Sequence, residues 1–196
     1  MRILIACEFS GIVREAFNAT HGNHAISCDI IPPEDERVDY HHQGDVRDIL
    51  HDGWDMMIAF PPCTHLAVSG ARWFKYKQQE QEWALDFVRL LMSAPIEKIA
   101  IENPVSIIST RIRKPDQIIQ PWQFGHEATK TTCLWLKGLP KLQPTNIVGK
   151  GSRHITKSGR SLPTWYNLPP SPTRGQERSR TFSGIAQAMA EQWSKI

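Results

Sequence analysis

The sequence lacks long hydrophobic runs and closely spaced cysteines. Its first apolar run, Ile3–Cys7, has only five residues, which is too short for a signal peptide or a membrane span. The four cysteines, at positions 7, 28, 63 and 133, are widely spaced and form no CxxC pair. We therefore expect no disulfide framework, no metal site and no membrane partner, and we predict a reducing, cytoplasmic location.

The sequence also lacks the glycine-rich motifs that hold phosphates. The first apolar run is followed by Glu8-Phe9-Ser10-Gly11 rather than by GxGxxG, and no GK[ST] sequence follows it. Dinucleotides and ATP are therefore disfavoured as ligands of this turn.

Apolar runs alternate with segments of helical periodicity. Strands are predicted at residues 2–7, 25–29, 55–60, 98–101 and 132–136, and helices at 12–20, 79–93 and 183–193. Apolar residues fall on one face of each of the last two helices: Trp83, Phe87, Leu90 and Leu91 in one, and Ile185, Ala188, Met189 and Trp193 in the other. The alternation predicts an α/β fold of the Rossmann-like kind, with a mostly parallel sheet and helices on both faces.

Polar residues follow several of the predicted strands directly. They are Glu8-Phe9-Ser10, Asp29, Asp45, Pro62-Cys63 and Glu102-Asn103. Ligands of open α/β sheets bind beyond the carboxyl ends of the strands. We therefore expect these residues to lie around one site.

The first part of this set suits a nucleoside without phosphates. Gly11 allows close approach of the backbone, and the helix after it offers amide groups to a carboxylate. Asp29 is placed to accept both hydroxyls of a ribose. Asp45 is placed to accept from the amine of adenine. Each acid alone is more often a helix cap or a solvated loop residue, but together they describe an adenosine with an amino-acid tail.

The second part of the set suits nucleophilic chemistry. Two prolines stiffen the turn that presents Cys63, and a thiolate there is a good nucleophile. A free cysteine is usually a buried apolar residue, but Cys63 follows a strand in a polar loop. Cys63 and His65 supply only two metal ligands, so His65 is expected to be structural. Glu102 suits proton donation to a ring nitrogen, and an acid at a helix start is a plausible alternative.

A cysteine and a glutamic acid beside S-adenosylmethionine fit one reaction in particular. Carbon 5 of cytosine is a poor nucleophile until a thiolate adds to carbon 6 and an acid hydrogen-bonds or protonates nitrogen 3. Carbon 5 then attacks the methyl group, and loss of its proton and of the thiolate completes the reaction. Amine and hydroxyl acceptors do not require a cysteine.

These motifs resemble those of the cytosine-5 DNA methyltransferase family. Similar segments are Leu4–Phe17, Gly44-Asp45-Val46, Pro61-Pro62-Cys63, Glu102-Asn103-Pro104, Phe124-Gly125 with Lys130 and Leu134-Trp135-Leu136, and Ser183–Gln192. The resemblance implies DNA cytosine-5 methylation with S-adenosylmethionine as cofactor. It implies a catalytic set of Cys63, Glu102, Asn103, Pro62 and Lys130. It implies cofactor binding by Glu8, Phe9, Ser10, Gly11, Asp29, Ile30, Asp45, Val46, Phe60, Pro61 and Ser183.

The chain departs from the family pattern in three places. The strand that carries the family's two arginines reads Ala128-Thr129-Lys130-Thr131-Thr132 here, so that the second arginine falls on Thr132 and Lys130 is the available cation. Lysine lacks the guanidinium fork. The Glu-Asn-Val motif has become Glu-Asn-Pro, which stiffens the turn. The family's target-recognition domain is nearly absent, as in short methylase-like proteins of phages and prophages.

The resemblance divides the chain into three parts. Residues 1–138 are expected to form the cofactor-binding catalytic domain, 139–180 a reduced target-recognition region, and 181–196 a helix that packs back on the catalytic domain. Charge is unevenly placed, because residues 1–60 hold 11 acids and four Lys or Arg, whereas 137–180 hold nine Lys or Arg and one acid. The basic region fits a solvated loop and a phosphate-binding surface equally well. The expected phosphate-binding residues are Lys150, Arg153, Lys157, Arg160, Arg174 and Arg178. Trp165 and Tyr166 are placed to stack on a base or to form local core.

Three functions fit this sequence, two catalytic and one without catalysis. Duplex or single-stranded DNA, in a bacterial or phage-infected cell, is the first. The same chemistry on RNA or on a free cytosine nucleotide, or transfer of a modified group, is the second. A non-catalytic nucleic-acid binder that retains the fold is the third; loss of the second arginine favours it, and the intact Pro62, Cys63, Glu102 and Asn103 disfavour it.

Overall fold

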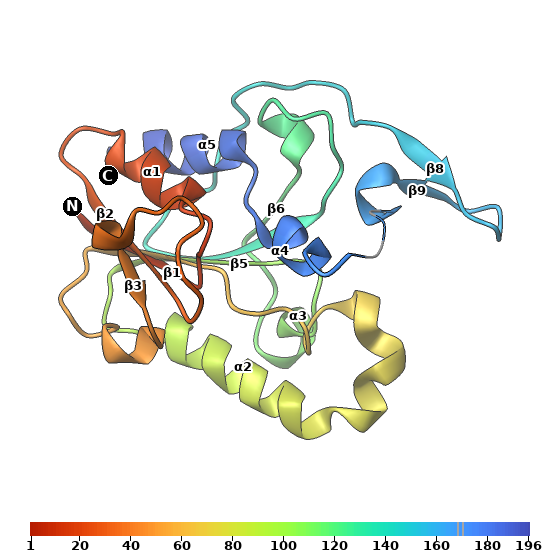
Figure 1. Cartoon of the computed structure of the whole chain (residues 1–196), viewed down its shortest axis with the longest axis horizontal. Coiled ribbons are helices and arrows are strands. Elements are labelled where there is room, and N and C mark those ends of the chain that lie inside the picture. The colour runs from red at the N-terminus through yellow and green to blue at the C-terminus, as the bar shows by residue number, and fades with distance from the viewer. Residues whose placement is uncertain (168, 170) are drawn as a thin grey trace.

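The computed structural model describes residues 1–167, 169 and 171–196. A seven-stranded sheet runs through its centre in the order β3-β2-β1-β4-β5-β7-β6 (Figure 1). In chain order the strands are β1 (Arg2–Ala6), β2 (His24–Asp29), β3 (His41–Gln43), β4 (Met56–Ala59), β5 (Lys98–Asn103), β6 (Gln117–Ile119) and β7 (Thr132–Lys137). Only β7 runs antiparallel to its neighbours within this sheet. The predicted α/β class with a mostly parallel sheet is confirmed.

The central strands form because their side chains are apolar on both faces. In the pairing of β1 with β4, Ile3 lies opposite Met56 and Ile5 opposite Ile58, and all four side chains are fully buried. Strands that are covered on both sides have continuous apolar sequences rather than alternating ones. This property made β1, β4 and β5 visible in the sequence.

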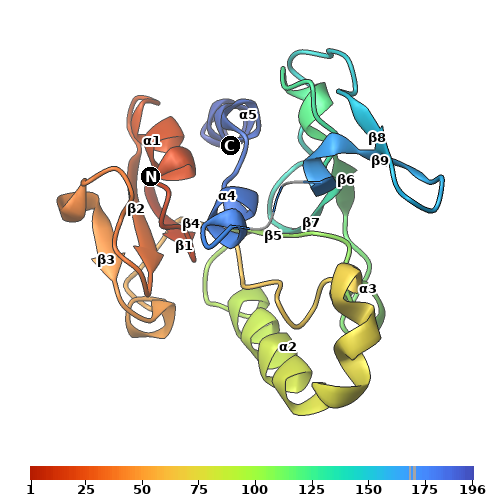
Figure 2. The ribbon, with the colours of Figure 1, turned by 45° about the vertical axis from the view of Figure 1, so that its right-hand side comes forward.

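Helices cover both faces of the sheet. The helices α1 (Ile12–Asn18) and α5 (Ser183–Trp193) lie side by side on one face, and α2 (Gln78–Met92) and α3 (Ile108–Arg111) lie on the other (Figure 2). The predicted inner face of α5 is confirmed, because Ile185, Ala188, Met189 and Trp193 are all buried.

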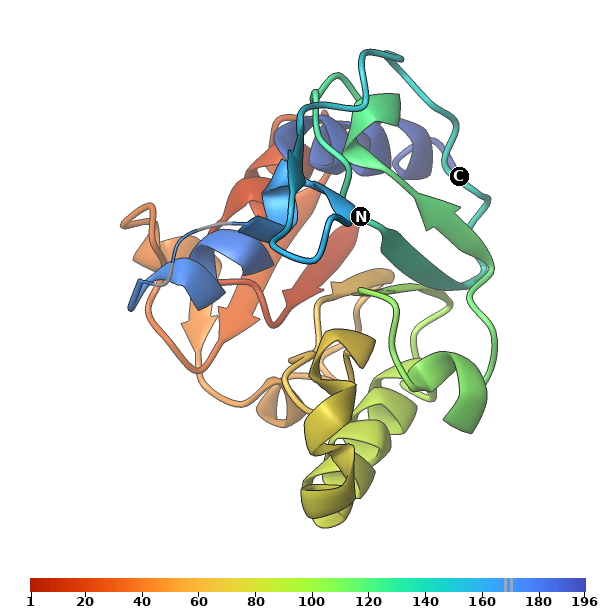
Figure 3. The same ribbon diagram turned by 90° about the vertical axis from the view of Figure 1, so that its right-hand side faces the viewer.

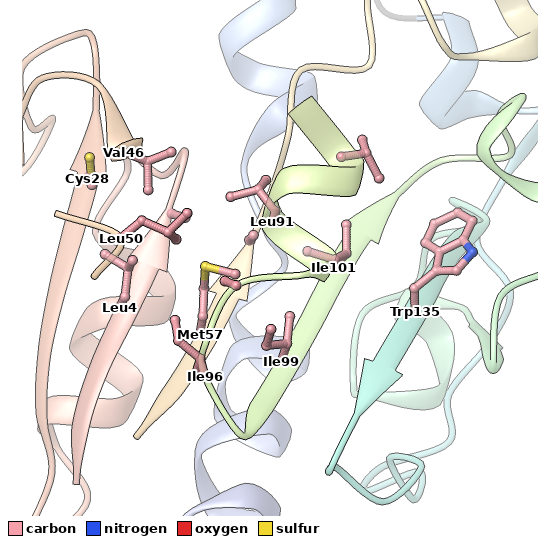
Figure 4. Packing of buried hydrophobic residues seen from close by; sticks show 14 of the residues in the cluster. Leu4, Cys28, Val46, Leu50, Met57, Leu91, Ile96, Ile99, Ile101 and Trp135 are labelled. Atoms are coloured by element: carbon pink, nitrogen blue, oxygen red, sulfur yellow. The ribbon is translucent and has the colours of Figure 1, made fainter. Parts of the chain in front are cut away.

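The prediction for α2 was wrong in one position. The helix packs on the sheet through Leu85, Val88 and Leu91, all within one core cluster. Leu91 is seen in Figure 4 near Ile101 and Met57 of that cluster. Trp83 was expected on this face, but its side chain is 62% exposed. At 100° per residue, Trp83 lies nearly opposite Leu85, so that it faces away from the sheet.

Residues 139–180, the expected reduced target-recognition region, contain some regular structure. A two-stranded hairpin, β8 (Arg153–Ile155) with β9 (Ser161–Pro163), extends away from the sheet, and α4 (Arg174–Ser179) follows it (Figure 1). The 3-10 helices are η1 (Val38–Tyr40), η2 (Val46–Asp48), η3 (Val68–Tyr76), η4 (Pro121–Gln123) and η5 (Thr164–Asn167). No helix of the described residues is both long enough and apolar enough to span a membrane.

Candidate active site

The predicted polar residues meet in one cleft beyond the carboxyl ends of β1, β2, β4 and β5. Its volume is about 980 Å³, and residues from 165–166 and 172–181 complete its lining. The lining includes Glu8, Phe9, Ser10, Asp29, Ile30, Asp45, Val46, Phe60, Pro61, Pro62, Cys63, Glu102, Asn103, Lys130 and Arg178. The expected convergence is therefore confirmed. We call the part around Glu8, Asp29 and Asp45 the β1–β2 end, and the part around Cys63, Glu102 and Lys130 the β4–β5 end.

Asn103 joins the two loops that form the β4–β5 end. Its side chain is 1% exposed, and its Nδ2 donates a hydrogen bond of 2.9 Å to the carbonyl oxygen of Pro61. The Cys63 carbonyl in turn accepts from the amides of Leu66 and Ala67 at 3.0 and 2.9 Å. Asn103 thus fixes the start of the turn that presents Cys63, and it acts as a positioning residue.

Backbone hydrogen bonds also join these loops. The Ile107 amide donates to Leu66 at 3.0 Å, and the Val68 amide donates to Val105 at 3.1 Å. The Cys63 loop and the loop after Glu102 are therefore tied to each other by backbone as well as side-chain hydrogen bonds.

Burial and the neighbouring charges together set the protonation of Cys63 and Glu102. Desolvation of the thiol within the cleft, and then the Glu102 carboxylate, raise the pKa of Cys63, whereas Lys130 and Arg178 lower it. Burial raises the pKa of Glu102, and Lys130 lowers it. The resting site therefore favours a neutral thiol beside a carboxyl group that retains its proton to higher pH than usual.

Lys130 lines the cleft, whereas Thr132 does not. Its Nζ donates to the Arg178 carbonyl at 3.0 Å and lies 5.6 Å from the centre of the Trp165 ring. Thr132, in contrast, is 4% exposed and lies outside the lining of the cleft. Lys130 is therefore the cation that faces Cys63 and Glu102 from β7's side of the cleft.

At the β1–β2 end, Glu8 corrects one expectation. The amides at the start of α1 were predicted to be available to a ligand carboxylate. The buried Glu8 side chain accepts from the Val13 amide at 2.7 Å and from the Arg14 amide at 3.2 Å. Burial outweighs these hydrogen bonds and raises the pKa of Glu8 to about 7. The chain's own carboxyl group thus occupies the place expected for a ligand.

Asp29 and Asp45 differ in how they are held. Asp29 ends β2 and accepts from the Ile31 amide at 3.3 Å, and burial raises its pKa. Asp45 forms an ion pair with Arg47 at 2.5 Å and accepts from the Arg47 amide at 2.9 Å. The hydrogen bonds from Arg47 lower the pKa of Asp45. Asp29 is therefore the carboxyl group with fewer partners within the chain.

Two predicted cofactor residues do not line the cleft. Gly11 has a φ of 72°, and a Cβ atom at this position would collide with Asp35 and Arg14. Its role in the structure is to let the loop after β2 pack closely. Ser183 begins α5, with its Oγ 3.4 Å from His126 Nε2. Thr181 lines the cleft instead, and sequence analysis missed it because it lies just before the predicted helix.

The predicted phosphate-binding residues divide into two groups. Arg153 lies on β8, Lys157 and Arg160 lie between β8 and β9, and Lys150 precedes β8; none of the four lines the cleft. Figure 3 views the molecule from the side toward which this hairpin projects. Arg153 is held there by hydrogen bonds of 2.9 and 2.7 Å to Ser161. Arg178 lines the cleft, together with Trp165 and Tyr166, whereas Arg174 does not. The hairpin cations are thus separate from the cavity.

The cysteines and acids form no metal cluster within the described residues. All four cysteines are free thiols. Cys7 and Cys28 line the β1–β2 end, and Cys7 has a φ of 58°. Nothing in the sequence signals that dihedral angle, and neither thiol was among the expected site residues.

No protein-family model matches the chain, and no curated protein sequence matches it. Among solved structures, the chain is similar to the methyltransferase EhMeth of Entamoeba histolytica, with a TM-score of 0.48 and 14% sequence identity. The similar region covers 78% of this chain and 58% of that chain, so this chain spans less than two thirds of the other's length. The residues of the cleft therefore carry the functional assignment.

Proposed function

We propose that this protein is an S-adenosylmethionine-dependent methyltransferase that methylates carbon 5 of cytosine in DNA through a covalent bond to Cys63. One observation carries the proposal. A cysteine on a proline-stiffened turn and a glutamic acid with a raised pKa line the same cleft, and a lysine faces both. This combination suits addition to a pyrimidine ring, which an amine or hydroxyl acceptor does not need.

The β1–β2 end fits the adenosine part of the cofactor. Asp29 is placed to accept from the ribose hydroxyls, and Ile30, Val46 and Phe60 offer apolar contacts to adenine. Asp45 can accept from the adenine amine only in competition with Arg47. The methionine carboxylate cannot use the α1 amides that Glu8 occupies. Ser10 already donates to Glu8 at 3.3 Å, so we propose the Thr181 hydroxyl of the cleft lining as a donor to this carboxylate.

At the β4–β5 end, each residue has a distinct part in the chemistry. The Cys63 sulfur, once deprotonated, bonds to carbon 6 of cytosine while Glu102 shares its proton with nitrogen 3. The bound cofactor supplies the methyl group from its sulfonium. Carbon 5 takes this methyl group with the electron pair made available by the addition. Transfer of the carbon 5 proton to water and expulsion of the Cys63 thiolate restore the aromatic ring and the enzyme.

Lys130 and Asn103 support this chemistry without forming bonds to the base. Lys130 lowers the pKa of Cys63 and of Glu102, so that it stabilises both anions as they form. Asn103 keeps the Cys63 turn against the end of β5 through its hydrogen bond to Pro61. Removal of either residue is expected to change the geometry or protonation of the site rather than abolish the nucleophile.

Residues from 165–166 and 172–181, which line the same cleft as Cys63, restrict what can enter. The Lys130–Arg178 hydrogen bond and the Arg180–Glu34 ion pair hold the second of these segments in place. A cytosine within a base-paired stack does not fit such a cleft, so the base must be unpaired or extruded at a cost of a few kcal/mol. We therefore propose single-stranded DNA as the preferred form of the substrate.

The direct test is the identity of the product. The protein is incubated with S-adenosylmethionine and with single-stranded DNA, duplex DNA, RNA or CMP, and the digested nucleosides are analysed by mass spectrometry. The proposal expects 5-methylcytosine in DNA, most of all in single strands, and none with Cys63→Ser. If only RNA or only CMP is methylated, that molecule rather than DNA is the substrate. A product methylated on an exocyclic nitrogen, or binding without any product, would overturn the proposal.

A further inference from the structure

We propose that residues 68–83, which directly follow the Cys63 loop, bind the single-stranded DNA next to the target cytosine. We call this segment the aromatic arm; it consists of η3 and the first turns of α2, and η3 is yellow in Figure 1. The inference rests on the proposed function, because it assigns a path to the polynucleotide substrate. None of the phosphate-binding residues expected from the sequence lies in this segment.

The aromatic arm exposes three large rings. Trp73 is 52% exposed, Tyr76 is 68% exposed and Trp83 is 62% exposed. No residue of η3 is buried. Burial of a large aromatic ring stabilises a fold. Rings that stay this exposed are therefore characteristic of surfaces that bind a partner.

Charge on the aromatic arm identifies the kind of partner. The aromatic arm contains Arg72, Lys75 and Lys77. Its two acids, Glu80 and Glu82, lie at its end in α2, and Glu82 is paired with Arg111. The Arg72 guanidinium lies 5.1 Å from the Trp73 ring centre, and Lys75 Nζ lies 4.6 Å from the Tyr76 ring centre. Rings that stack on bases, interleaved with cations that meet phosphates, are the features by which proteins hold single-stranded nucleic acid.

The aromatic arm is continuous with the active site. Thr64, Ala67, Ser69 and Gly70 line the cleft that contains Cys63, and Trp73 follows three residues after Gly70. The hydrogen bond from the Val68 amide to Val105 anchors the start of the arm to the β5 loop. A strand whose cytosine reaches Cys63 therefore has the aromatic arm at the edge of the same cleft.

The aromatic arm and the β8–β9 hairpin lie on different sides of the sheet. The arm lies beside α2 and α3, and the hairpin projects beyond the opposite face (Figures 1 and 2). The hairpin has cations but no exposed tryptophan, whereas the arm has both. We therefore assign base stacking on one side of the target cytosine to the arm, and phosphate contact on the other side to the hairpin.

The first experiment measures DNA binding without chemistry. A fluorescent 12-residue oligothymidylate, which contains no cytosine, is titrated with Cys63→Ser protein, and anisotropy gives the dissociation constant. Trp73→Ala and Tyr76→Ala are each expected to weaken binding about tenfold, in line with the loss of one stacked base. Trp73→Phe retains a ring and is expected to bind nearly as tightly as the parent. Ile118→Ala, which removes an exposed apolar side chain on β6, is the matched control and should have no effect.

The second experiment separates stacking from charge. The logarithm of the binding constant is measured against the logarithm of salt concentration. Lys75→Gln should reduce the slope by about 0.7, which is the value for one phosphate contact with a single strand. Trp73→Ala should weaken binding without changing the slope. Lys114→Gln, which removes an exposed lysine between α3 and β6, should leave both quantities unchanged.

The outcomes separate the aromatic arm from the proposed function. If the intact protein does not bind the oligonucleotide, or if only hairpin substitutions such as Arg160→Gln weaken binding, the assignment to the arm is wrong. Formation of 5-methylcytosine can still be observed in that case. If the arm variants lose binding but the parent protein forms no 5-methylcytosine, the arm is a nucleic-acid surface and the proposed reaction is wrong.

Discussion

The two ends of the cleft differ in how fully their polar side chains are hydrogen-bonded or paired within the chain. At the β1–β2 end, Glu8 caps α1 and Asp45 is paired with Arg47. At the β4–β5 end, the scaffold is tightly bonded through Asn103, but Cys63 is exposed to the cleft. The first end is thus organised before any ligand binds, whereas the second fixes its backbone and keeps its reactive groups available. Preorganised backbone with free reactive groups is what a covalent reaction requires.

The largest effect is expected from the acid of the β4–β5 end. Glu102→Gln retains the size of the side chain but removes the proton that, in the proposed reaction, is shared with the cytosine ring. The methylation rate under saturating substrates should fall by a factor of about 10²–10⁴, the usual contribution of a positioned general acid. Single-turnover kinetics measure it. A loss of less than fivefold would show that Glu102 is only a structural residue at the end of β5.

The β1–β2 end should show an unequal response of its two acids. Asp29→Asn is expected to weaken cofactor binding about tenfold, because charge-assisted hydrogen bonds are lost. Asp45→Asn should weaken it less than about threefold, since Arg47 already engages that carboxylate. Calorimetric titration with S-adenosylhomocysteine gives both values. The reverse order would mean that Arg47 releases Asp45 when the cofactor binds.

Lys130 offers a test by pH. It lowers the pKa of both Cys63 and Glu102, so Lys130→Met should raise both pKa values. Both limbs of the pH–rate profile should then move to higher pH. Lys130→Arg keeps the charge and serves as the control, with limbs close to those of the parent. If neither limb moves in Lys130→Met, Lys130 does not influence the protonation of Cys63 or Glu102 during the reaction.

The smallest effect concerns stability and involves only the β1–β2 end. The pKa of Glu8 is raised from 4.5 to about 7 in the folded protein. Folding therefore favours the protonated form, so that this stabilisation is complete below about pH 4.5 and is lost as the pH rises to about 7. Glu8→Gln removes this dependence. The free energy of unfolding, measured with denaturant, should fall between pH 4.5 and pH 7.5 by about 1–3 kcal/mol less in the variant than in the parent.

Much of the fold was readable because the buried strands are continuous apolar runs. β1, β4, β5 and β7 and the helices α1, α2 and α5 were predicted within a few residues of their bounds. The strands β3 and β6 were missed because each has only three residues. The hairpin in the basic region was missed because its strands are equally short and largely exposed.

The location of the site was predictable from the sequence, whereas its individual contacts were not. Residues at the ends of parallel strands meet by topology, and Cys63, Glu102 and Asp29 needed no other signal. The capping of α1 by Glu8 depends on a turn whose path the sequence does not specify. The aromatic arm escaped notice because a tryptophan in a helical pattern suggests core, as it did for Trp83. Exposure is decided by packing partners elsewhere in the chain.

The most direct test of the account is a trapping experiment with Cys63. The protein and S-adenosylmethionine are mixed with single-stranded and duplex DNA that contain 5-fluorocytosine, in which carbon 5 has no proton to lose. The account predicts an adduct that resists denaturation, forms fastest with the single strand, and is absent in Cys63→Ser. Mass spectrometry should place the DNA and the transferred methyl group on the peptide that contains Cys63. An adduct that persists in Cys63→Ser, or 5-methylcytosine formation by that variant, would contradict the account.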